Sequence, residues 1–100
     1  MIRIAMYTDQ MIQDALMIFM NNPFWNKVYN GAPSEGCKER LRLMFCRSTF
    51  SPPNAEEFYT YRGELDETLS IEDWKYLQKY GGHNPFWLTC QRHIDNLQGR

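Results

Sequence analysis

Asn22-Pro23-Phe24-Trp25 is the stretch from which the fold is best read, because the same four residue types return at 84–87. An asparagine side chain accepts hydrogen bonds from the free N–H groups of a helix start, and proline fits the first helical position. Phenylalanine and tryptophan then add large apolar surfaces. Both copies therefore predict a helix start capped by asparagine. We expect their four aromatic residues in the core, with one tryptophan partly exposed.

Working outward from the repeat, hydrophobic periodicity and capping residues predict five helices. Thr8 is a suitable cap for the first helix, Ser34 for the third and Ser70 for the fourth. Asn30-Gly31-Ala32-Pro33 and Gly81-Gly82 have the composition of turns. The predicted helices cover about 8–20, 23–29, 34–49, 70–80 and 84–97.

Two stretches have the composition of β-strands. Residues 2–7 alternate apolar and polar side chains, and residues 57–62 are rich in tyrosine and phenylalanine. We therefore predict a single α+β domain over residues 1–100, with a small sheet of two or three strands packed against four or five helices. Thr8 precedes Asn22 by fourteen residues, and Ser70 precedes Asn84 by fourteen. This spacing also fits a pseudo-twofold strand–helix–helix repeat, although convergence on one helix start explains it more simply.

Composition excludes several classes of protein. The chain has 100 residues, 43% of them hydrophobic, and a formal net charge of −1. It therefore has enough apolar residues to fold, and it lacks the strong positive charge of a nonspecific nucleic-acid binder. It also lacks an apolar run long enough to cross a membrane. Three widely spaced cysteines fit a reducing compartment, so we expect a cytoplasmic protein.

Cys90 and His93 are the residues best suited to metal binding or catalysis. They could ligate zinc or form a Cys–His nucleophile, but both lie on the apolar stripe of the last predicted helix. A buried thiol and imidazole are ordinary there. The chain also lacks glycine-rich phosphate loops and the usual hydrolase motifs. We therefore predict a protein with no catalytic residues, no metal and no cofactor.

Several helices are predicted to be apolar on more than one side. Leu43 and Phe50 lie opposite Leu41 and Phe45 on the third helix, which means either that this helix sits between layers or that one side binds a partner. Methionine, tyrosine and arginine are typical of interfaces. The predicted protein-binding residues are Met17, Met20, Arg42, Leu43, Arg47, Phe50, Tyr76 and Tyr80.

The leading functional hypothesis is a small non-catalytic interaction domain that regulates or inhibits a protein by occupying its surface. Self-association into a homodimer is included in this hypothesis. Origin from a phage or mobile element would suit such a small inhibitor. The alternative is a nucleic-acid-binding regulator that uses the basic helix over 38–47 and two strand tyrosines. Its binding residues would be Lys38, Arg40, Arg42, Arg47, Tyr59 and Tyr61. These arginines could instead face solvent or the acidic stretch 64–73.

The first half of the chain resembles the opening of the GNAT acetyltransferases. The resemblance comprises the first strand, the helix ending Phe19-Met20-Asn21-Asn22-Pro23, and Arg40-Leu41-x-x-Met44-Phe45. The acetyl-CoA-binding turn of that family is missing from the sequence, so the resemblance implies a degenerate acyltransferase fragment without a cofactor site. Separately, Asn-Pro-Phe resembles the tripeptide that EH domains recognise, although those ligands are exposed and flexible.

Overall fold

The protein is all-helical over the residues that its computed structural model describes, which are 7–81 and 84–99. These residues form six α-helices and no strand. In chain order the helices are α1 (Asp9–Met20), α2 (Pro23–Asn30), α3 (Glu35–Thr49), α4 (Ala55–Thr68), α5 (Ile71–Gly81) and α6 (Asn84–Gln98). The prediction of an α+β fold is therefore wrong. The predicted strand over 2–7 lies outside the described residues except for Tyr7.

The predicted strand over 57–62 is a turn and a half of α4. Its aromatic composition favoured a strand, but the residues before it specify a helix start. Asn54 accepts a hydrogen bond from the Glu57 backbone N–H, and its side-chain amide donates to the Glu57 carboxylate. This reciprocal cap, followed by Phe58, Tyr61 and Leu65 at helical spacing, was present in the sequence.

The five predicted helices are confirmed with small shifts of their ends. Thr8 accepts a hydrogen bond from the Met11 N–H, and Ser34 accepts one from the Cys37 N–H, as expected of N-caps. Ser70 and Asp73 form a full capping box at the start of α5, because each side chain accepts from the other's backbone N–H.

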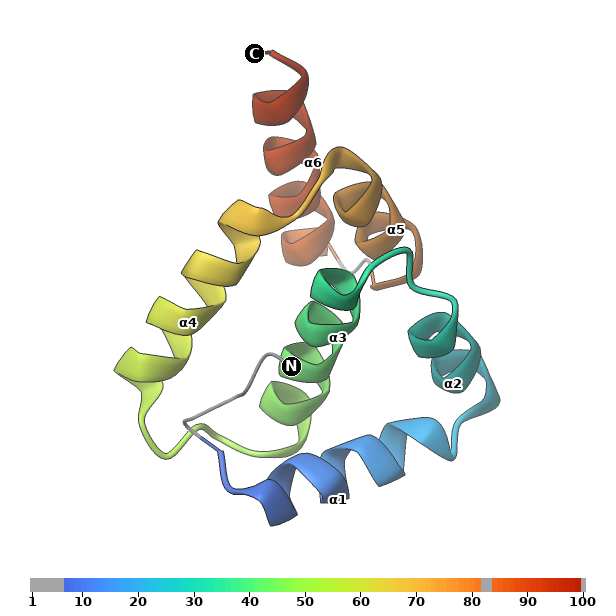
Figure 1. Ribbon diagram of the computed structural model, residues 1–100, viewed down its shortest axis with the longest axis vertical. Helices are drawn as coiled ribbons and strands as arrows, with labels where there is room; N and C mark the ends of the chain where they lie inside the picture. The colour runs from blue at the N-terminus through green and yellow to red at the C-terminus, as the bar shows by residue number, and fades with distance from the viewer. Residues whose placement is uncertain (1–6, 82–83, 100) are drawn as a thin grey trace.

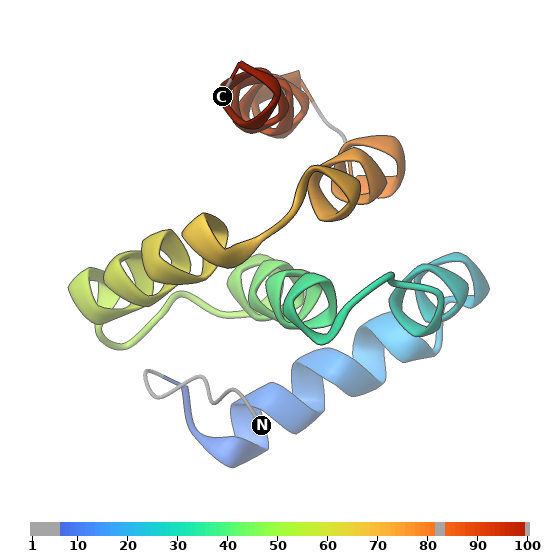
Figure 2. The same ribbon diagram turned by 45° about the horizontal axis from the view of Figure 1, so that its top comes forward.

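The third helix, α3, occupies the centre of the fold. Figure 2 shows α3 between α1 on one side and α4 and α5 on the other, with α6 outside α5. Helix α2 flanks α3 on the side opposite α4 (Figure 1). Because α3 has neighbours on several sides, Leu41 and Phe45 on one predicted apolar side and Leu43 on the other are all buried. Its buried residues are Cys37, Glu39, Arg40, Leu41, Leu43, Phe45 and Cys46.

The two Asn-Pro-Phe-Trp copies differ in their surroundings. Asn22 caps α2 by accepting hydrogen bonds from the N–H groups of Phe24 and Trp25, whereas α6 already begins at Asn84. In the first copy Trp25 packs edge-on against Phe45 of α3 while Phe24 is 51% exposed.

In the second copy the phenylalanine packs against the core and the tryptophan is exposed, the reverse of the first copy. Phe86 packs against the core under Arg40, and Trp87 is 43% exposed. Two of the four aromatic residues therefore lie at the surface, where we expected at most one. The strand–helix–helix repeat is also wrong, because residues 57–62 are helical and the segment between the proposed halves contains the central helix.

Loss of the Asn22 cap should destabilise the protein measurably. We expect Asn22→Ala to lower the free energy of unfolding by about 1 kcal/mol, since two N–H groups at the start of α2 lose their acceptor. Asn84→Ala should cost less, because Asn84 is the first residue of α6 and alanine favours helix. Urea unfolding followed by circular dichroism measures both. Equal losses would show that the two copies perform the same capping function.

Candidate protein-binding groove

The buried charges of α3 are paired within the fold. Arg40 donates from Nε to Asp66 Oδ1 over 2.7 Å, and both side chains are almost fully buried. The Arg40 guanidinium also lies over the Phe86 ring, 5.2 Å from its centroid. Arg40 thus connects α3 to α4 and α6, and its charge is not available at the surface.

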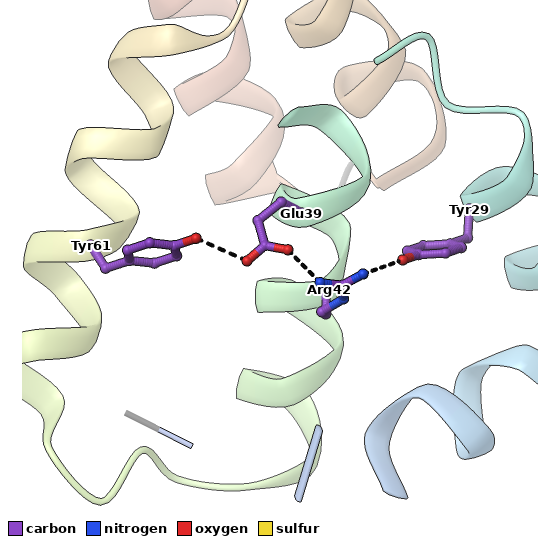
Figure 3. A network of polar contacts seen from close by, with 4 residues as sticks. All are labelled: Tyr29, Glu39, Arg42 and Tyr61. Carbon is purple, nitrogen blue, oxygen red and sulfur yellow. Dashed lines mark hydrogen bonds and ion pairs between the residues drawn. The ribbon is translucent and has the colours of Figure 1, made fainter. Parts of the chain in front are cut away.

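A second network, shown in Figure 3, crosses the molecule from α2 to α4 through α3. Arg42 donates to Glu39 Oε1 over 2.7 Å and to the Tyr29 hydroxyl over 2.9 Å, while Tyr61 donates to Glu39 Oε2 over 2.9 Å. Glu39 is 3% exposed, and burial raises the pKa of its carboxyl despite the Tyr61 hydrogen bond and the Arg42 charge. The network fixes α2, α3 and α4 relative to one another.

Half of the residues proposed to bind nucleic acid are hydrogen-bonded within these networks. Arg40, Arg42 and Tyr61 have internal partners, and Lys38 lies near Glu35 and the Tyr29 ring. Tyr59 and Tyr61 would share a face in a strand, but two residues along a helix they lie about 200° apart. Tyr59 consequently faces solvent while Tyr61 points toward α3.

The exposed remainder of that set is small. Arg47 and Arg62 flank Tyr59, and the Arg62 guanidinium lies 4.7 Å from the centroid of its ring. The hydrogen bond and positive charge of Arg47 lower the pKa of the Tyr59 hydroxyl below its ordinary value. Two arginines around one tyrosine form a local basic spot rather than a continuous basic stripe.

The residues predicted to bind protein separate into four pairs. Leu43 is fully buried and Arg42 is held in the network, so these two side chains serve the interior. Met20 and Phe50 are half-buried against the core. Met17 and Arg47 are exposed on α1 and α3, and Tyr76 and Tyr80 lie side by side on α5.

Tyr76 and Tyr80 line an apolar groove between α2 and α5. Its volume is about 370 Å³, and the residues along it are Phe24, Lys27, Val28, Gly31, Tyr76 and Tyr80. The Phe24 and Tyr80 rings lie 6.5 Å apart between centroids at one end, and Gly31 lies beside Tyr76 at the other. The two helices therefore run antiparallel along the groove, on the same side of α3 (Figure 1).

Tyr76 holds the two walls of the groove in place. Its hydroxyl donates to the Val28 carbonyl over 2.6 Å, and burial raises the pKa of that hydroxyl. A β-carbon at position 31 would come within 3.2 Å of the same hydroxyl oxygen. Gly31 thus lets the tyrosine reach α2 across the groove. This hydrogen bond ties α5 to α2 across the groove.

Phe24 and Lys27 are groove residues that sequence reasoning did not assign to a surface. The repeat predicts Phe24 in the core, since it makes both copies equivalent helix starts. The i, i+3 spacing of Phe24 and Lys27 on α2 does place them on one face. The sequence does not reveal, however, that this face lies opposite Tyr76 and Tyr80, since that depends on how both helices pack on α3.

A second cavity, of about 450 Å³, lies where α4, α5 and α6 meet. Its lining consists of Asp66, Glu67, Leu69, Trp74, His93, Asn96 and Leu97. Asp66 is already paired with Arg40. The His93 ring stacks on the Trp74 ring with 4.1 Å between their centroids. The Trp74 indole N–H lacks a hydrogen-bond partner among the described residues, but it is closed off from solvent. Glu67 and Asn96 are the exposed polar residues of this cavity.

Cys90 and His93 have surroundings typical of core residues. Burial raises the pKa of the Cys90 thiol to about 11 and lowers that of the His93 imidazole. A nucleophilic cysteine requires the opposite shift, since the thiolate is the reactive form. No group of three or more candidate metal ligands occurs within residues 7–81 and 84–99, and His83 lies outside them.

Comparison of the chain with protein-family models, curated proteins and solved structures finds no match. The comparison thus gives no support to the resemblance to GNAT acetyltransferases. Among the helices of the described segments, none combines the length and apolar character needed to cross a lipid bilayer.

Removing Arg42 should destabilise the fold. We expect Arg42→Met to lower the free energy of unfolding by about 2 kcal/mol, because it leaves the Glu39 carboxylate buried without its counter-charge. Arg47→Met is the matched control, since Arg47 is exposed on the same helix, and it should change stability by less than about 0.5 kcal/mol.

A double variant separates pairing from packing. Glu39→Met combined with Arg42→Met should lose less stability than the sum of the two single variants, because no unpaired charge remains. Additive losses in urea unfolding would contradict this account of the network.

Proposed function

We propose that this protein is a small non-catalytic protein-binding domain, which regulates or inhibits a partner by occupying part of its surface. The observation that carries the proposal is the α2–α5 groove with half-exposed Phe24 at its edge. Aromatic residues in a preformed groove bind partner side chains at low entropic cost. Tyr76 and Tyr80, predicted from the sequence to bind protein, are two of its lining residues.

The size of the groove favours a segment of a partner over a small molecule as the occupant. Its volume of about 370 Å³ is near the lower limit of drug-sized pockets. A short helix or loop could place a few side chains into it while the rest of the partner contacts the flanking surfaces of α2 and α5. This is the usual organisation of a helix-lined recognition groove.

Selection from a random displayed peptide library, using the whole immobilised protein, tests the proposal. We expect a family of related peptides whose affinity falls about tenfold with Phe24→Ala and with Tyr80→Ala, since each removes a groove wall. Tyr59→Ala is the matched control, because Tyr59 is an exposed aromatic residue on α4 outside the groove, and it should leave affinity within about twofold.

Circular dichroism melting of every variant shows whether the fold is retained. A failure to enrich peptides would contradict the proposal, as would peptides that bind the folded Phe24 and Tyr80 variants as tightly as the unchanged protein.

A further inference from the structure

The charges around the groove are positive and unpaired within the described part of the chain. Lys27 is the single charged residue of α2 and lines the groove. Lys79 lies over the Tyr80 ring, with its Nζ 5.2 Å from the ring centroid. Among residues 7–81 and 84–99, neither lysine has a carboxylate within ion-pair distance. Both ammonium groups are free to pair with a ligand.

The acidic residues of α5 lie at the far end of the groove. Asp73 is buried and accepts hydrogen bonds from the Ser34 hydroxyl and the Ser70 N–H. Glu72 lies in the first turn of α5, about two turns from Tyr80. The end formed by Phe24 and Tyr80 therefore combines apolar walls with uncompensated positive charge.

We infer that the segment bound by the groove is acidic and packs one large apolar side chain along the groove against Phe24 and Tyr80, an inference that rests on the proposed function. Carboxylates on either side of this side chain pair with Lys27 and Lys79. The charge complementarity raises the association rate and sets the orientation, while the apolar side chain supplies most of the affinity.

A single-stranded nucleic acid is the main competing occupant, because bases also stack on aromatic rings beside lysines. The groove fits it less well. The chain has a net charge of −1 and provides two lysines here rather than a basic track along several phosphates. Val28 and the closed Tyr76 end also suit an aliphatic or aromatic side chain better than a continuous strand of nucleotides.

The test uses peptides from the library selection, together with versions in which every Asp and Glu is replaced by Asn and Gln. We expect the selected peptides to be rich in acidic residues around one aromatic or leucine residue. The neutral versions should bind about tenfold more weakly. Lys27→Glu and Lys79→Glu should each weaken the acidic peptide by a similar factor, whereas Arg92→Glu, an exposed charge reversal on α6, should not.

The outcomes separate the inference from the proposed function. Peptides that need Phe24 and Tyr80 but are neutral, or that are unaffected by Lys27→Glu and Lys79→Glu, would overturn the inference and leave the proposed function standing. Tighter groove-dependent binding of a single-stranded oligonucleotide would also overturn the inference. So would a homodimer in solution that Tyr80→Ala dissociates, because a second copy would then occupy the groove.

Discussion

Burial of the central part of α3, from Cys37 to Cys46, is the constraint on which the rest of the structure depends. A helix surrounded by neighbours must pair every charge that it takes into the interior, because an unpaired buried charge costs several kcal/mol. Arg40 meets this requirement with Asp66, and Glu39 does so with Arg42 and Tyr61. Asp66 and Tyr61 come from α4, and Arg42, on α3 itself, also donates to Tyr29 of α2. Charge pairing and helix packing therefore specify the same arrangement.

This constraint also determines where function can reside. The helix that appears most basic in the sequence uses its central arginines to hold the fold together, which leaves only a local arginine–tyrosine spot around Tyr59. The groove between α2 and α5 retains side chains whose groups are not used internally. Phe24 is half-exposed, and Lys27 has no ion-pair partner among the described residues. A binding function is therefore better supported there than on α3.

The sequence predicts the local structure more completely than the arrangement of the helices. Thr8, Asn22 and Ser34 cap helices as their residue types require, because an N-cap depends on neighbours within three positions. Aromatic content predicts a strand over 57–62, but the Asn54–Glu57 cap specifies a helix start there. Tyr76 and Tyr80 could be recognised as a stripe, but Phe24 could not be assigned to the same groove, since their proximity depends on packing around α3. Likewise, apolar residues on two sides of α3 fit either a central helix or a helix with one side exposed to a partner. The burial of both sides shows that α3 is central.

Native-state hydrogen exchange measures most directly whether α3 is the centre of the fold. The amides of Leu41, Leu43 and Phe45 should exchange only through global unfolding, with opening free energies equal to the stability found in urea. The ends of α1 and α6, which have fewer neighbours, should exchange through smaller local openings. Exchange of the α3 amides at lower free energies than those of α5 and α6 would contradict the account. It would mean that α3 can open while the other helices remain folded.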